Sequence, residues 1–105
     1  MSDPTETGAL LDASVRLPQH VVYRSFPGET VVLNLTTGKY HGLNVTAAQI
    51  LDEFEKGRTP REAAAAIAER YGHDEREVQA DVVTLCRHLL ERQLIEVVDA
   101  ADDGP

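Results

Sequence analysis

The sequence predicts an α+β domain in which a three-stranded antiparallel sheet is followed by three helices. Two observations lead to this fold class. β-branched and aromatic residues gather in three short segments within residues 20–43, and turn-forming residues separate these segments. Apolar residues recur at helical spacing within residues 46–93, between residues that cap helices. A small sheet beside three compact helices is typical of a winged-helix-like fold.

The composition indicates a single globular domain. The chain has 105 residues, of which 42% are hydrophobic and 27% are charged, which suits one hydrophobic core. No apolar run approaches the roughly 20 residues that span a bilayer, and residues 1–17 lack the basic and apolar regions of a secretory signal. We therefore expect a cytoplasmic protein without membrane contact. Residues 1–16 and 99–105 are expected to be flexible tails around a domain at residues 17–98.

Three segments have the length and composition of strands: residues 20–26, 30–35 and 39–43. The triplets at residues 27–29 and 36–38 contain glycine with proline or threonine and favour tight turns, so we expect an antiparallel meander. Because alternate residues of a strand point to opposite faces, Val31, Leu33 and Leu35 share one face of the second strand. We expect this apolar face to pack against the helices.

Capping signals define the first two predicted helices. Thr46 and Gln49 have the spacing of a capping box, so the first helix is expected at about residues 47–56. The segment Thr59-Pro60-Arg61-Glu62 repeats this signal with proline at the first helical position, and the helix then continues to residue 71 before a glycine. The inward-facing positions are Ile50, Leu51 and Phe54 in the first helix, and Ala63, Ile67 and Tyr71 in the second.

The third predicted helix begins at Asp74 and ends near Gln93. Its apolar positions span an arc of roughly 160°, wider than the roughly 100° stripe of an ordinary surface helix. Either one edge of this arc is available to a partner, or the domain surrounds the helix with core on two sides. The positions are Val78, Val82, Val83, Leu85, Cys86, Leu89 and Leu90. The apolar residues 94–98 are expected to form an extra strand or an extended tail.

Residue types that carry catalysis or bind metals are present but do not converge. His20, His41, His73 and His88 fall in different segments without the spacing of a metal-binding motif. Cys86 lies two residues from His88 on one helix, so their side chains diverge and do not form a nucleophile–base pair. We expect Cys86 to be a packing residue. The protein is therefore expected to be non-catalytic, with no metal and no cofactor.

Several segments occur together in an order that resembles the PqqD-like family, whose members are called precursor-peptide recognition elements. These segments are residues 20–26 (HVVYRSF), 31–44 (VVLNLTTGKYHGLN), 57–62 (GRTPRE) and 82–95. The resemblance covers about residues 17–98. In the pattern of residues 33–44 the chain is most similar to the stand-alone members that serve the biosynthesis of lasso peptides, which are ribosomally synthesised and then modified.

The resemblance implies a protein that binds the leader segment of a precursor peptide and presents it to a partner leader peptidase and a cyclase. The leader would add as a strand to the sheet edge, in the groove between the third strand and the third helix. The implied edge strand is Lys39, Tyr40, His41, Gly42 and Leu43. The implied apolar pocket is Val31, Leu33, Val78, Val82, Leu85 and Cys86, unless these residues serve the core alone. Glu77 and Asp81 would pair with a basic or polar leader residue, unless they form an ordinary solvated helix face.

Two other functional classes fit parts of the pattern. A winged-helix DNA-binding regulator would share the fold, but the formal net charge of −8 and the acidic start of the third helix disfavour nucleic acid as a partner. A structural subunit that binds a protein partner without a leader peptide is the second alternative. Because no heptad pattern is visible, we expect a monomer when the peptide is bound.

Overall fold

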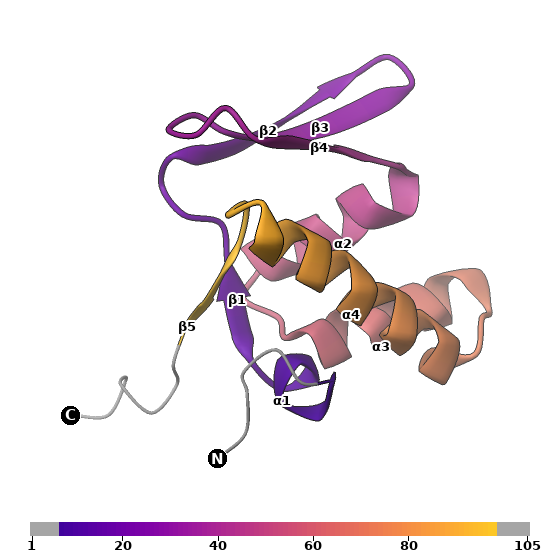
Figure 1. The fold of residues 1–105 in the computed structure, drawn as a ribbon. Coiled ribbons are helices and arrows are strands. Elements are labelled where there is room, and N and C mark those ends of the chain that lie inside the picture. Colours follow the sequence, from indigo (N-terminus) through magenta and orange to yellow (C-terminus); the bar gives the residue numbers. More distant parts are fainter. Residues whose placement is uncertain (1–6, 99–105) are drawn as a thin grey trace.

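The computed structural model describes residues 7–98. The elements in chain order are α1 (Thr7–Leu11), β1 (Ser14–Arg16), β2 (Val21–Phe26), β3 (Glu29–Asn34), β4 (Tyr40–Leu43), α2 (Val45–Glu55), α3 (Pro60–Tyr71), α4 (Glu75–Glu91) and β5 (Glu96–Val98). Figure 1 shows the sheet of β2, β3 and β4 as one layer, with α2, α3 and α4 packed on one side of it. The predicted α+β class, with the sheet preceding three helices, is confirmed.

The three-stranded sheet is an antiparallel meander with the order β2-β3-β4. Tyr23 pairs with Val32, which in turn pairs with His41, so these residues share one face of the sheet. The turns between the strands contain Gly28 and Gly38, whose φ angles of 81° and 78° favour glycine. The predicted meander is therefore confirmed, and β4 is an edge strand.

The sheet face that packs on the helices is the opposite of the predicted one. Val32 and Asn34 are both 0% exposed, whereas Leu35 is 62% exposed. Val31 and Leu33 are half-buried on the outer face. The apolar alternation of Val31, Leu33 and Leu35 was therefore a misleading signal, because the buried face includes a polar residue.

Asn34 is buried because its side-chain amide has hydrogen-bond partners. Its Nδ2 donates to the carbonyl of Gln93 at 2.8 Å. Its Oδ1 accepts from the backbone N–H groups of Thr36 at 2.9 Å and Thr37 at 3.0 Å. A buried amide that makes such bonds avoids most of the cost of leaving water. Asn34 thereby ties the β3–β4 turn to the segment that follows α4.

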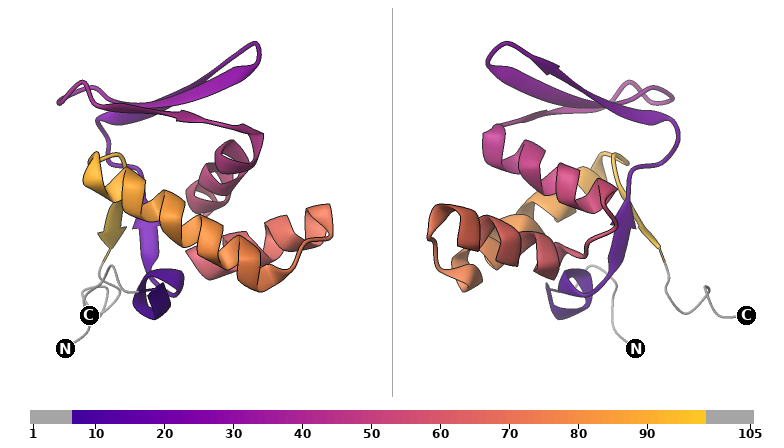
Figure 2. Two further views of the ribbon diagram at one scale, coloured as in Figure 1. Left: turned by 45° about the vertical axis from the view of Figure 1, so that its right-hand side comes forward. Right: turned by 180° about the vertical axis from the view of Figure 1, so that it is seen from behind.

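The chain ends of the described region form a second, two-stranded sheet. β1 pairs antiparallel with β5, and Arg16 Nε donates to Glu96 Oε1 at 2.7 Å. In both views of Figure 2 this pair lies away from the three-stranded sheet. Leu10 of α1 and Val15 of β1 are buried in the core. The expectation of a flexible tail is therefore wrong for residues 7–16, while residues 1–6 and 99–105 lie outside the described part.

Both α2 and α3 begin at local capping signals, but one of the two predicted caps is wrong. In α3, Thr59 and Glu62 form the predicted capping box, and Gly72 ends the helix at a φ of 68°. The predicted cap of the first helix at Thr46 is wrong, because Asn44 Oδ1 accepts from the N–H of Ala47 at 2.8 Å and the helix starts at Val45. Asparagine is at least as favourable as threonine at an N-cap, so the sequence alone did not distinguish Asn44 from Thr46 as the first residue of the helix cap.

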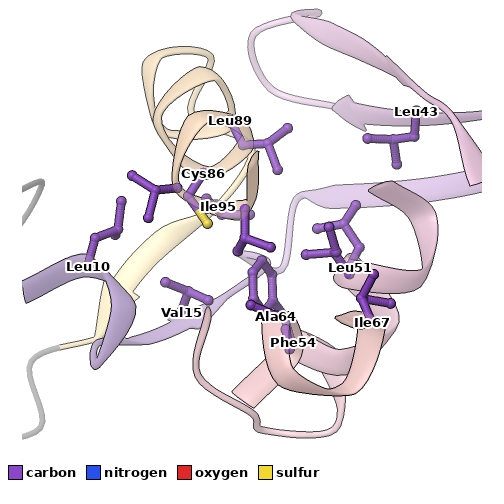
Figure 3. Packing of buried hydrophobic residues seen from close by; sticks show 14 of the residues in the cluster. Leu10, Val15, Leu43, Leu51, Phe54, Ala64, Ile67, Cys86, Leu89 and Ile95 are labelled. Atoms are coloured by element: carbon purple, nitrogen blue, oxygen red, sulfur yellow. The ribbon is translucent and has the colours of Figure 1, made fainter. Parts of the chain in front are cut away.

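The core is one cluster to which all described helices and both sheets contribute. Figure 3 shows Leu10, Leu51, Ile67, Cys86 and Leu89 converging from α1, α2, α3 and α4. Burial raises the pKa of the Cys86 thiol to about 12, so this thiol is protonated at neutral pH. The prediction that Cys86 is a packing residue is confirmed. The wide apolar arc of α4 is explained in part by this core, because five of its residues are buried: Val78, Val82, Val83, Cys86 and Leu89.

Candidate functional site

A groove with a volume of about 480 Å³ lies between β4 and α4. The end of β4 and the start of α2 form one wall, the middle of α4 forms the other, and α3 closes one end. The lining residues are His41, Gly42, Asn44, Thr46, Ala47, Ile50, Ile67, Tyr71, His73, Val78, Asp81, Thr84, Leu85 and His88. Aliphatic side chains therefore lie beside imidazoles and one carboxylate in the same groove.

The strand that borders this groove has an unpaired edge. β4 pairs with β3 on one side, and no other strand of residues 7–98 pairs with its second side. The carbonyl of Lys39 accepts from the N–H of Asn34 at 2.9 Å, so the main chain of Lys39 faces β3. Because the bonding direction alternates along an antiparallel strand, the N–H and C=O groups of Tyr40 and Gly42 face the open edge. These groups are available to another extended chain.

The structure brings five of the predicted site residues into the groove: His41, Gly42, Val78, Asp81 and Leu85. Lys39 and Tyr40 line a second pocket of about 440 Å³, which they share with Gly38, Glu91 and Arg92. Since Tyr40 precedes His41 in β4 and Arg92 lies one turn after His88, the second pocket continues the groove toward the C-terminal end of α4.

Other predicted site residues lie elsewhere. Val31 and Leu33 pair with Gly42 and Tyr40 but lie on the outer face of the sheet, so the expectation that they floor the groove is wrong. Leu43, Val82 and Cys86 are buried in the core and do not line the groove. Glu77 is exposed on α4 outside the lining residues. The inverted sheet face accounts for Val31 and Leu33, whereas Val82 and Cys86 lie on the side of α4 that packs into the core.

Several residues that line the groove were not predicted from the sequence. His88 continues a helical spacing already visible in α4, because Val78, Asp81, Leu85 and His88 are three or four residues apart and share one face. Tyr71 was expected in the core but is 44% exposed, and its hydroxyl donates to Gln49 Oε1 at 2.9 Å. A tyrosine with a polar partner can remain at a groove wall while its ring contacts apolar atoms.

Histidines from β4, from α4 and from the loop between α3 and α4 line the groove. The ring centroids of His41 in β4 and His88 in α4 are 6.2 Å apart, so these imidazoles face each other across it. At the α3 end, the rings of Tyr71 and His73 are stacked with centroids also 6.2 Å apart. Burial lowers the pKa of His41, and the positive charge of Arg92 and the proximity of His88 lower it further. His41 is therefore neutral at pH 7 and offers one donor and one acceptor.

Within residues 7–98, no group of three or more His, Cys, Asp or Glu side chains is arranged to hold a metal ion. No helix in that range is long and apolar enough to cross a membrane.

Comparison with known proteins identifies relatives of this fold. The family model described as coenzyme PQQ synthesis protein D (PqqD) matches residues 29–95, more than half of the chain. The structure of TbiB1 in complex with the TbiA(beta) leader peptide is similar, with 32% identity, a TM-score of 0.70, and coverage of 77% of this chain and 94% of that chain. A lasso peptide synthetase B1 complexed with the leader peptide is 25% identical, with a TM-score of 0.73 and coverage of 80% and 99%. No curated protein gives a significant match.

Proposed function

Since the chain belongs to the PqqD family, we propose that it binds the leader segment of a ribosomally synthesised precursor peptide of the lasso-peptide type. The leader adds as a strand to the open edge of β4 and places side chains in the groove against α4. The observation that carries this proposal is the unpaired edge of β4 running beside an open groove. Strand addition of this kind draws affinity from main-chain hydrogen bonds and specificity from side-chain pockets.

Tight binding of the leader requires both main-chain hydrogen bonds and the burial of apolar side chains. Tyr40 and Gly42 offer two N–H and two C=O groups at the open edge, and each hydrogen bond contributes about 0.5–1.5 kcal/mol. Micromolar affinity corresponds to about 8 kcal/mol of binding free energy, so these bonds alone are insufficient. Val78 and Leu85 supply apolar surface in the groove, and a buried aliphatic side chain contributes about 1.5–3 kcal/mol. The leader therefore needs apolar side chains directed at α4.

Both similar structures support the proposal that the ligand is a leader peptide, because each was solved in complex with one. One of these proteins is a lasso peptide synthetase B1. The match to the family model covers residues 29–95, so it includes β4 and α4, the strand and the helix that form the groove. This agreement between fold and groove favours leader binding over a DNA-binding role.

We assign the protein a non-catalytic role, in which it presents the bound leader to a separate leader peptidase and a cyclase. Cys86, the only cysteine, is buried in the core with a raised pKa and so does not offer a thiolate nucleophile to the groove. We place this complex in the cytoplasm, where ribosomes make the precursor. As a leader carrier, the chain is expected to act as a monomer.

The test is fluorescence anisotropy with the labelled leader of the precursor peptide encoded beside this gene. We expect saturable binding at micromolar concentration or tighter. Tyr40→Ala and Leu85→Asp should weaken it at least tenfold, whereas Leu35→Asp, at an exposed leucine outside the groove, should leave it unchanged.

A modified peptide tests strand addition without changing the protein. Single N-methyl groups placed along the leader remove one main-chain donor at a time, and those opposite Tyr40 or Gly42 should weaken binding in an alternating pattern. Absence of binding by the folded wild-type protein would refute leader recognition. Binding without the alternating pattern would refute strand addition.

A further inference from the structure

The two walls of the groove run in opposite directions, and this places different charges at its two ends. Lys39 of the β3–β4 turn shares a pocket with Arg92, directly after α4. Asp81 lines the groove about three helical turns earlier in α4. Between these ends lie the facing imidazoles of His41 and His88. The groove is therefore basic at one end and acidic at the other.

The two cations at the basic end are not neutralised by ion pairs within residues 7–98. Neither Lys39 nor Arg92 takes part in the ion pairs that Arg16, Lys56, Arg58 and Arg61 form with acidic side chains. Arg92 Nη1 donates a hydrogen bond to the carbonyl of His88 at 3.4 Å. Glu91 lines the same pocket, so the three side chains together carry one net positive charge.

The positive charge at the basic end also acts on His41, farther along the groove. The positive charge of Arg92 is one of the causes that lower the pKa of His41, after burial of the imidazole. The chain as a whole carries a formal net charge of −8, so its long-range field repels an acidic peptide. A local pair of cations beside the edge strand is thus the feature that makes an acidic side chain favourable at this position.

We propose that the groove selects its peptide by charge polarity: an acidic leader residue lies between Lys39 and Arg92, and a basic residue lies at Asp81. This inference rests on the proposed function and extends it to the sequence and direction of the leader. Complementary charges contribute more to specificity and orientation than to affinity. The hydrogen bonds of a strand form in either direction on an open edge, so the charges decide which end of the leader lies at Lys39.

The experiment combines charge reversals in the protein and in the peptide. The probe is the fluorescein-labelled leader of the precursor peptide encoded beside this gene, with each acidic residue changed in turn to lysine and each basic residue changed to glutamate. The protein variants are Lys39→Glu, Arg92→Glu and Asp81→Lys. The matched control for Lys39→Glu and Arg92→Glu is Arg24→Glu, at an exposed arginine on the outer face of the sheet, which alters the net charge by the same amount.

Each reversal at the groove should weaken binding of the unmodified leader about fivefold, the scale expected for partly exposed charge pairs. Arg24→Glu should change it less than twofold. Lys39→Glu and Arg92→Glu should regain affinity with one lysine-substituted peptide, and Asp81→Lys should regain it with a glutamate-substituted peptide. The two rescuing positions should lie at opposite ends of the bound segment.

Two outcomes separate this inference from the proposed function. If the wild-type protein binds the leader and the reversals at Lys39 and Arg92 behave like Arg24→Glu, charge polarity is refuted while leader binding stands. If the folded wild-type protein binds no leader, both are refuted. Because the side chain of Lys39 is exposed, its variant should fold normally, and circular dichroism checks this directly.

Discussion

Replacing Asn34 with alanine tests how the two walls of the groove are held together. The side chain makes three hydrogen bonds: one to Gln93 after α4, and two to Thr36 and Thr37 in the β3–β4 turn. At about 1 kcal/mol for each bond, the variant should lose roughly 2–3 kcal/mol of unfolding free energy. For a domain of this size the melting temperature should fall by roughly 10–20 °C.

Urea unfolding followed by circular dichroism measures this loss, with Leu35→Ala as the control. Leu35 is the next residue but is 62% exposed, so its truncation should change the unfolding free energy by less than about 0.5 kcal/mol. Leader binding should also weaken in Asn34→Ala under conditions where the variant is folded, because the turn before Lys39 is no longer tied to the segment after α4. If Asn34→Ala unfolds at the same urea concentration as Leu35→Ala, the assigned role of this amide is wrong.

Three further predictions concern titratable groups. Burial opposes ionisation of Glu53, but hydrogen bonds from Lys56 and Arg58 outweigh it and lower its pKa below the ordinary 4.5 of a glutamate. Its contribution to stability should therefore be present at neutral pH and be lost as the pH falls through this lowered pKa. Glu53→Gln should lose about 1–2 kcal/mol at pH 7 and show a flatter acid limb in urea unfolding. Burial lowers the pKa of His41, so the unfolded chain binds this proton more readily than the folded one. Stability should therefore fall as the pH drops below 6.5, the ordinary pKa of a histidine, and His41→Gln should remove that pH dependence. Cys86 should react with a disulfide reagent only after unfolding, because its thiol is buried and its pKa is raised to about 12; rapid labelling of the native protein would contradict its place in the core.

The candidate site could be predicted in outline because its walls follow local patterns. The glycine-containing turns define β4 as the last strand of the meander, and the spacing of Val78, Asp81 and Leu85 defines one face of α4. Residues from α2 and α3 that close the groove carry no such signal. Their position depends on how the helices pack, which involves contacts between distant segments.

What the sequence determined by itself was the set of elements whose signals are local. The turns at Gly28 and Gly38, and the start and end of α3, depend on residues a few positions apart, so the same interactions operate before the chain is folded. Tertiary structure alone decided which face of β3 is buried, since Asn34 is stabilised there by Gln93, 59 residues away. It also decided that β1 is a strand, because three residues form a stable ladder only against β5, and Arg16 and Glu96 are separated by 80 residues. Such long-range partners exist only once the helices have packed.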